Sequence, residues 1–215
     1  ENLTTNKSIL DWLQTRIDLL QPDKVVWIDG SEEQIQALKD EAVATGEFIK
    51  LNEEKLPDCY FHRTNPNDVA RVEDRTFICT PTKAEAGPLN NWMDPDEMKS
   101  ILNGIYDGCM RGRTMYVVPY SMSVLGSPFA KYGIELTDSI YVVISMAIMT
   151  RMGKEVYTAL GDSDDWVRGL HCKCDIDEEK RYICHFPQDN TIYSVNSGYG
   201  GNVLLGKTVS YTHLR

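Results

Sequence analysis

The sequence lacks any hydrophobic run of the roughly 20 residues that a membrane-spanning helix needs. Its first eight residues also lack the apolar core of a secretory signal peptide. Basic residues are in deficit, since 22 lysines and arginines stand against 32 aspartates and glutamates, giving a net charge of −10. Bulk electrostatics therefore argue against nucleic acid or an anionic membrane as a partner, and any anionic ligand must be held locally. We expect a cytoplasmic protein.

The six cysteines lack the regular spacing of a disulfide framework, and a chain of 215 residues does not need one. Reduced thiols are therefore the expectation. Zinc is the alternative, because His171-Cys-Lys-Cys174 and Cys184-His185 offer suitable ligands within a short stretch. No C-x-x-C pair occurs there, and strand alternation would send Cys184 and His185 to opposite faces of a sheet. We favour buried or half-buried strand cysteines and expect no metal site.

Apolar residues at helical spacing predict helices in four places. The first runs from Ser8 to Leu20. The second opens with the capping box Ser31-Glu-Glu-Gln34 and ends near Gly46, and the third begins at Asp94. The fourth covers Ser139 to Met152, where strand-forming residues compete with a consistent helical face and the length favours a helix.

Short apolar runs between these helices predict strands at Val25–Ile28, Thr76–Thr80 and Thr114–Val118. Two further runs, Arg181–His185 and Thr191–Val195, flank a turn that begins with proline, which is typical of a hairpin. No repeat, low-complexity linker or charge block divides the chain. The order of elements indicates one α/β domain, a mixed sheet flanked by helices.

The segment Ser197-Gly-Tyr-Gly-Gly-Asn-Val-Leu-Leu-Gly-Lys207 is rich in glycine. Glycine lets main-chain N–H groups approach a ligand closely, Tyr199 offers a ring edge, and Lys207 supplies a positive charge. The segment is therefore typical of a small anion-binding turn, with a plain hairpin turn as the alternative.

Two arginines, Arg71 and Arg75, lie four residues apart just before an expected strand. A guanidinium can grip a carboxylate or phosphate through two parallel hydrogen bonds, which an ammonium cannot do. Local sequence nevertheless favours a solvated surface role for both arginines, because Asp68, Glu73 and Asp74 flank them.

Three further blocks, Arg111–Pro128, Gly133–Ser139 and Met149–Gly153, add to the glycine-rich segment. Together these blocks resemble the amino-terminal domain of GTP-dependent phosphoenolpyruvate carboxykinase, and the resemblance runs from about Asp23 to Lys207. Long, ordered, unrepetitive blocks of this kind are specific. The resemblance implies the α/β fold of that substrate-binding domain.

The resemblance also implies site residues. Arg71 would bind the carboxylate or phosphate of oxaloacetate and phosphoenolpyruvate. Tyr199, Gly200 and Gly201 would be substrate contacts, the tyrosine through its ring edge and the glycines through main-chain amides. Arg75 gains no such role and is expected to be a surface residue. No catalytic or metal-binding residue is carried over, because Thr208 stands where the family has its metal-binding lysine.

The activity implied for the whole enzyme is a lyase reaction of gluconeogenesis, in which oxaloacetate and GTP give phosphoenolpyruvate, GDP and CO2. It needs GTP, a divalent metal (Mn2+ or Mg2+) and a carboxy-terminal GTP-binding lobe, which in the family follows the region seen here. We expect residues 1–208 to be the substrate-binding domain and residues 209–215 to be a tail foreign to the family. Alone, this fragment is expected to be inactive and to bind neither GTP nor metal tightly.

The residues Gly201–Thr208 also match the bare pattern of a phosphate-binding loop, G-x-x-x-x-G-K-T. Such a loop follows a strand and opens a helix, whereas this stretch carries three apolar residues, Val203 to Leu205, and has only seven residues after it. A stand-alone small-anion or nucleotide-binding module is therefore the alternative function.

Overall fold

The structure is a computed structural model that describes residues 2–65, 67–68 and 72–198. Its α-helices are Lys7–Leu20 (α1), Glu32–Ala44 (α2), Pro95–Tyr106 (α3), Ile140–Met149 (α4) and Glu155–Leu160 (α5). Its strands are Lys24–Trp27 (β1), Phe48–Lys50 (β2), Tyr60–His62 (β3), Thr76–Ile78 (β4), Asn91–Trp92 (β5), Thr114–Ser121 (β6), Tyr132–Thr137 (β7), Arg151–Met152 (β8), Val167–Cys172 (β9), Tyr182–Phe186 (β10) and Thr191–Val195 (β11). Short 3-10 helices occupy Glu73–Arg75 (η1), Lys83–Ala86 (η2) and Pro187–Asp189 (η3).

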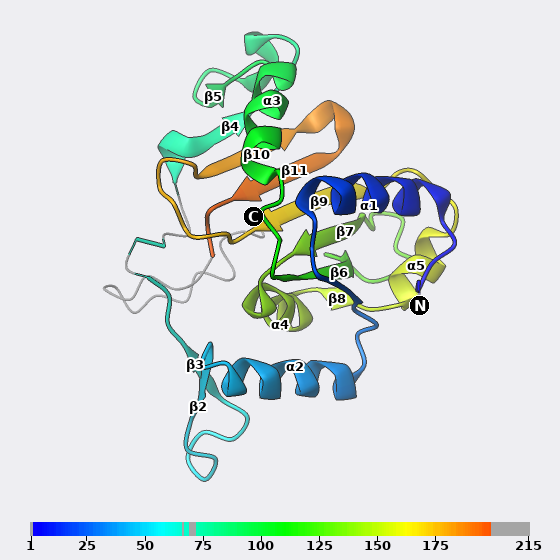
Figure 1. Ribbon diagram of the computed structural model, residues 1–215. Helices are drawn as coiled ribbons and strands as arrows, with labels where there is room; N and C mark the ends of the chain where they lie inside the picture. The colour runs from blue at the N-terminus through cyan, green and yellow to red at the C-terminus, as the bar shows by residue number, and fades with distance from the viewer. Residues whose placement is uncertain (1, 66, 69–71, 199–215) are drawn as a thin grey trace.

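Within the described ranges, nine strands form one mixed sheet in the order β1-β6-β7-β9-β11-β10-β4-β5, with β8 paired to β6. Strands β2 and β3 form a separate antiparallel pair beside α2 (Figure 1). Helices lie on both faces of the large sheet, with α1 and α3 on one face and α2 and α4 on the other (Figure 1). The expected mixed sheet flanked by helices is confirmed.

The helix ends follow from local hydrogen bonding. Asn6 caps α1 by accepting the amide hydrogen of Ile9 at 3.2 Å. Half of the expected capping box of α2 is present, since Ser31 accepts from the amide of Gln34 at 3.2 Å. The side chain of Gln34 instead accepts from the amide of Asp29 at 2.8 Å. No helix in the described ranges has both the length and the apolar character needed to cross a bilayer.

Helix α4 ends at Met149, three residues earlier than the sequence predicts. The reason is long-range pairing, because Arg151 and Met152 form β8 and pair antiparallel with the end of β6. The hairpin predicted from Arg181 to Val195 is confirmed as β10 and β11, which pair antiparallel on either side of η3.

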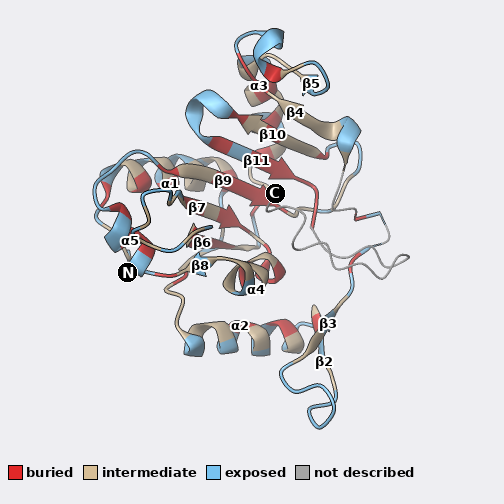
Figure 2. Ribbon diagram, turned by 180° about the vertical axis from the view of Figure 1, so that it is seen from behind, coloured by how far each residue is buried: buried red, intermediate tan, exposed pale blue. Residues whose placement is uncertain are grey.

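Two apolar clusters hold the layers together. The larger one packs α1 and α3 against the sheet and includes Leu13, Leu102 and Leu136. The smaller one packs α2 and α4 against β6 and includes Leu38, Val118 and Ile144. The buried residues concentrate in the central strands and the inward faces of the helices (Figure 2). This burial is the main favourable contribution to folding.

The strand directions define the edge of the sheet that matters for function. Strands β7, β9 and β11 run parallel to one another, while β10 is antiparallel to β11 and parallel to β4. The carboxyl ends of β7, β9 and β11 and the amino ends of β10 and β4 therefore lie along the same side of the sheet, at the ends of its strands. We call it the carboxyl edge. Ligands of open α/β sheets bind preferentially beside such strand ends.

Candidate functional site at the carboxyl edge

The residues that the sequence points to, Arg71, Tyr199, Gly200 and Gly201, lie outside the described residues, as does the stretch Gly201–Thr208. The residues just before them are described. Asn67 and Asp68 precede Arg71, and residues 196–198 precede Tyr199. We call these two short segments the approaches. Both lie at the carboxyl edge, where direct hydrogen bonds join one segment to the other.

Asp68 forms the first connection between the two approaches. Its carboxylate Oδ1 accepts the amide hydrogen of Gly198 at 2.7 Å, across 130 residues of sequence. Asp68 is 0% exposed, and its other oxygen, Oδ2, has no hydrogen-bond partner among the described residues. A charged acceptor on a main-chain amide makes one of the stronger protein hydrogen bonds. Asp68 therefore fixes the position of Gly198, the residue just before Tyr199 in the glycine-rich segment.

Arg181 forms the second connection. It comes just before β10 and is 3% exposed. Its Nε donates to the carbonyl of Asn196 at 2.9 Å, and its Nη2 donates to the carbonyl of Asn67, also at 2.9 Å. One planar guanidinium thus holds both approaches in a fixed relation, which its rigid fork of donors suits.

Asn196 completes this arrangement from the end of β11. Its backbone is left-handed, with φ of 60°, a conformation that asparagine tolerates better than most residues. Its side chain accepts from the amide of Asp177 at 3.2 Å and donates to the carbonyl of Lys180 at 3.0 Å. The turn after β11 is therefore tied to the loop between β9 and β10.

His171 lies in β9 and is 2% exposed. Its Nε2 donates to the carbonyl of Ser197, and its Nδ1 accepts from the hydroxyl of Thr137 at 2.7 Å. The hydroxyl oxygen of Thr137 in turn accepts from the amide of Ser139 at 3.1 Å, which leaves its hydrogen for Nδ1. Burial lowers the pKa of His171, so the ring is neutral at pH 7. This neutral tautomer holds the carbonyl of Ser197 in place.

Asp138 follows β7 at the same edge, and its side chain is 0% exposed. It accepts from the amides of Lys173 at 2.6 Å and Cys174 at 3.3 Å, and it pairs with Arg113 at 3.3 Å. Burial raises the pKa of Asp138, and the hydrogen bond from the amide of Lys173 and the charge of Arg113 oppose that rise. Asp138 therefore anchors the loop that follows β9.

Arg75 corrects one expectation from the sequence. It is half-buried, and its guanidinium donates to the carbonyls of Arg181, at 2.9 Å, and Glu179. It also lies over the ring of Tyr182 at 4.3 Å. The expectation of a surface residue was wrong, because the acidic neighbours Glu73 and Asp74 do not show which distant carbonyls the arginine reaches. Arg75 supports the segment that presents Arg181.

Sequence reasoning missed the roles of Asp68, His171 and Arg181. In the sequence analysis Asp68 served only as an acidic neighbour, which favoured a solvated surface role for Arg71. Its buried role depends on a contact with residue 198, which no local pattern reveals. Only Asn196 carried a usable signal, since an asparagine before Ser-Gly at the end of a strand suits a left-handed turn.

The described residues contain no group of three or more His, Cys, Asp or Glu side chains arranged to hold a metal ion. Strand β9 ends at Cys172, so Cys174 lies beyond the strand in the loop that follows it. Cys184 lies in β10, which β11 separates from β9. The described structure thus gives no support to the zinc alternative.

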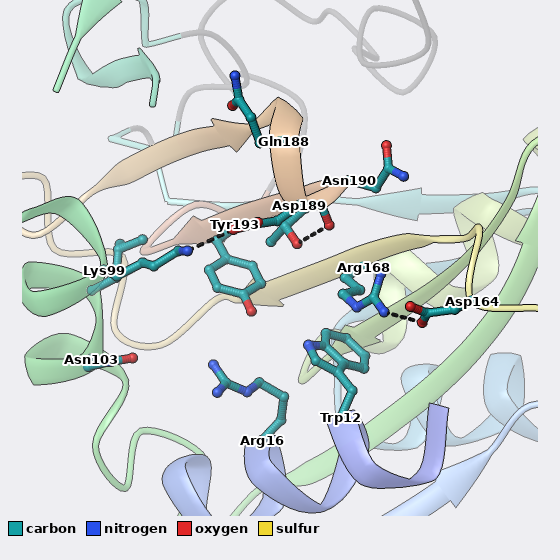
Figure 3. A pocket seen from close by; sticks show the side chains of 12 residues that line it. Trp12, Arg16, Lys99, Asn103, Asp164, Arg168, Gln188, Asp189, Asn190 and Tyr193 are labelled. Carbon is teal, nitrogen blue, oxygen red and sulfur yellow. Dashed lines mark hydrogen bonds and ion pairs between the residues drawn. The ribbon is translucent and has the colours of Figure 1, made fainter. Parts of the chain in front are cut away.

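A cavity of about 560 Å³ opens at the opposite edge of the sheet, where β9 and β11 begin (Figure 3). Two of its cations are engaged in ion pairs, Lys99 with Asp189 at 2.7 Å and Arg168 with Asp164 at 2.6 Å. Arg16 points into the cavity near the ring of Tyr193 (Figure 3). The cavity lies away from the carboxyl edge and brings together no recognisable catalytic group.

Replacing Gly198 with alanine tests how tightly the two approaches are packed. A Cβ at Gly198 would lie 2.5 Å from Oδ2 of Asp68 and 3.3 Å from its Cγ. The buried carboxylate would have to move and lose its bond to the amide, so the free energy of unfolding should fall by about 1–3 kcal/mol. Urea unfolding of the 215-residue chain measures this change.

The matched control is Gly104→Ala in α3. A Cβ there meets no atom within 4 Å, and alanine favours the helix, so this variant should gain up to about 1 kcal/mol. Equal stability of the two variants would contradict the close contact between Gly198 and Asp68.

Comparison with known proteins adds a family assignment to this geometry. The model of a family described as phosphoenolpyruvate carboxykinase N-terminal domain matches residues 11–213. A protein named phosphoenolpyruvate carboxykinase (GTP) from Anaeromyxobacter dehalogenans (strain 2CP-C) is 57% identical over 204 residues, which cover 95% of this chain and 34% of the relative. Proteins of the same name from Corynebacterium kroppenstedtii and Corynebacterium jeikeium are 50% and 46% identical, each across 95% of this chain and across 34% and 36% of their own lengths. The chain spans about a third of the length of these relatives.

Proposed function

Because the chain belongs to the phosphoenolpyruvate carboxykinase N-terminal domain family, we propose that it supplies the substrate-binding half of a GTP-dependent phosphoenolpyruvate carboxykinase. That enzyme is a cytoplasmic lyase of gluconeogenesis, which converts oxaloacetate and GTP to phosphoenolpyruvate, GDP and CO2. In this proposal Arg71 grips a carboxylate or phosphate of the substrate. Tyr199, Gly200 and Gly201 contact the substrate from the other side.

The observation that carries the proposal is the joining of the two approaches at the carboxyl edge. Gly198 bonds to Asp68 at 2.7 Å, and Tyr199 is the next residue along the chain. Arg71 follows Asp68 by three residues, a length of chain that spans at most about 11 Å. An arginine and a glycine-rich turn that start from the same point can reach one small anion.

The charges at this edge support a local grip on the ligand. The protein carries a net charge of −10, so its overall field repels a dianion such as oxaloacetate. The buried groups at the edge carry both signs, with Arg181 positive and Asp68 and Asp138 acidic. A two-pronged arginine contact and several main-chain amides provide the specific attraction that the net charge does not.

We assign GTP and the divalent metal, Mn2+ or Mg2+, to the full-length enzyme and its GTP-binding lobe. The metal would stabilise the developing enolate oxygen there. To this chain we assign the binding and orientation of substrate. We expect the 215 residues alone to bind substrate without turning it over.

An NMR titration with phosphoenolpyruvate, oxalate and GTP tests this function. Phosphoenolpyruvate and oxalate should shift the amide signals of Asp68, Ser197 and Gly198 with about millimolar affinity, near −4 kcal/mol. GTP should leave these signals in place, and a turnover assay with oxaloacetate, GTP and manganese should show no product above a no-protein control. Saturable shifts with GTP alone would favour the nucleotide-binding module instead. Absence of shifts with both small anions at about 10 mM would reject the proposal.

A further inference from the structure

Three cysteines, Cys109, Cys172 and Cys174, form a thiol cluster beside the carboxyl edge. Their side chains lie close enough together to shift one another's pKa, and Cys109 and Cys174 pack against the apolar cluster that contains Cys172. All three are free thiols. They come from the turn after α3, the last residue of β9 and the loop that follows β9.

The three thiols differ in access and in freedom to move. Cys172 is 0% exposed and sits in β9 between β7 and β11. Its carbonyl accepts from the amide of Asn196 at 2.9 Å, which fixes it further. Cys109 and Cys174 are half-buried and lie outside regular strands and helices. A solvent-borne reagent can therefore reach the latter two.

The surroundings of Cys174 favour its thiolate. Hydrogen bonds from Cys109 and from Cys172, together with the nearby positive charge of Arg113, hold the pKa of Cys174 well below its ordinary value. The peptide groups of Cys174 are held as well, because its amide donates to Asp138 and its carbonyl accepts from Arg113 at 3.1 Å. Its backbone is left-handed, with φ of 49°, which is uncommon for cysteine.

We propose that Cys174 and Cys109 form a redox site that a hydroperoxide converts to a disulfide. The thiolate of Cys174 attacks the outer oxygen of the hydroperoxide, the O–O bond breaks, and the leaving oxygen takes a proton to become water or an alcohol. The resulting sulfenic acid is attacked by the thiol of Cys109, an S–S bond forms, and water leaves. Two thiols are thereby oxidised by two electrons, and the hydroperoxide is reduced by two.

Cys109 resolves the sulfenic acid because Cys172 cannot move. A disulfide needs defined Cβ positions, and any backbone shift at Cys172 to reach them would disturb a strand that is paired on both sides.

Two other sets of cysteines in the chain serve as controls for this site. Cys79 and Cys184 form a thiol pair that is closed to solvent, at 1% and 0% exposure. Cys59 is half-buried and has no thiol partner among the described residues.

Peptide mapping of the reduced 215-residue chain after brief treatment with hydrogen peroxide at pH 6 tests the site. Cys174 should be oxidised at least about tenfold faster than Cys59, because the neighbours of Cys174 favour its thiolate, which is the form that attacks a peroxide. The product should be a disulfide between Cys109 and Cys174, with Cys79 and Cys184 still reduced. In the variant Cys109→Ser, dimedone should instead trap a sulfenic acid on Cys174. The variant Cys172→Ser should still form the disulfide.

This site does not depend on the proposed substrate role, so the two can fail separately. Oxidation of Cys174 no faster than that of Cys59 in the unmutated chain would overturn the inference. A product that joins Cys172 to Cys174, or one that joins Cys79 to Cys184 first, would overturn it equally. Because these readouts come from the unmutated chain, they stand even if a variant does not fold.

Discussion

Replacing Glu135 with glutamine should raise the free energy of unfolding by up to about 5 kcal/mol at pH 9 and change it little at pH 4. Glu135 lies in β7, opposite Val118 of β6 and Gly169 of β9. Gly169 has no side chain, and a Cβ there would overlap Oε2 of Glu135. The carboxyl group occupies that space, and burial raises the pKa of Glu135 to about 8.

The sign of the effect follows from proton binding. The folded pKa of Glu135, about 8, exceeds its ordinary value of 4.5, so the folded state holds the proton over a pH range in which the unfolded state has lost it. Stability from this group is complete below pH 4.5 and is lost as the pH rises through 8. Glutamine keeps the shape and stays neutral, so the variant avoids that loss.

Urea unfolding of both proteins between pH 4 and pH 9 measures the difference. The control is Glu54→Gln, which removes the same charge from an exposed position and should change stability by no more than about 0.5 kcal/mol at any pH. A gain for Glu135→Gln that is the same at pH 5 and pH 9 would show that the carboxyl group is not held protonated by the fold.

The elements of the fold that depend on local pattern were predictable from the sequence. Apolar spacing identified α1, and a serine three residues before Gln34 identified the start of α2. The end of α4 was not predictable, because it depends on pairing between Arg151 and Ser121 in β6. Strand order is likewise a long-range property, and nothing local places β11 between β9 and β10.

The candidate site likewise has a part that local sequence predicts and a part that depends on long-range contacts. Arg71 and the glycine-rich turn were predicted from residue type and from family resemblance. Their common anchor was not, because Asp68 and Gly198 are 130 residues apart and the bridging Arg181 carries no motif. Arg75 shows the opposite error, since local acidic neighbours suggested solvent where the guanidinium bonds to two distant carbonyls.

This correction for Arg75 changes the choice of control for the central binding test. Arg75→Ala would remove bonds to the segment that presents Arg181, so it would alter both charge and structure. Arg63 is the better control, because it is exposed and its described contact is with the neighbouring ring of Phe61. Arg63→Ala removes one positive charge near the same part of the chain and leaves the connections at the carboxyl edge intact.

Arg71→Ala should abolish detectable binding of phosphoenolpyruvate in the NMR titration, whereas Arg63→Ala should leave it nearly unchanged. Each charge-assisted hydrogen bond contributes about 1.5–3 kcal/mol, so loss of a two-pronged contact weakens a millimolar complex by at least roughly tenfold. Arg71→Lys keeps the charge but not the paired donors, so it should recover only part of the affinity.

The comparison among these three variants separates a specific contact from general attraction. If Arg63→Ala weakened binding as much as Arg71→Ala, net charge would be the operative variable, since both lower it equally. If Arg71→Lys bound as tightly as the unmutated chain, a point charge would suffice and the two-pronged grip would be wrong. Unchanged amide signals for Asp68 and Gly198 in the unbound Arg71→Ala chain would show that lost affinity comes from the missing guanidinium, because the anchor beneath the site is still formed.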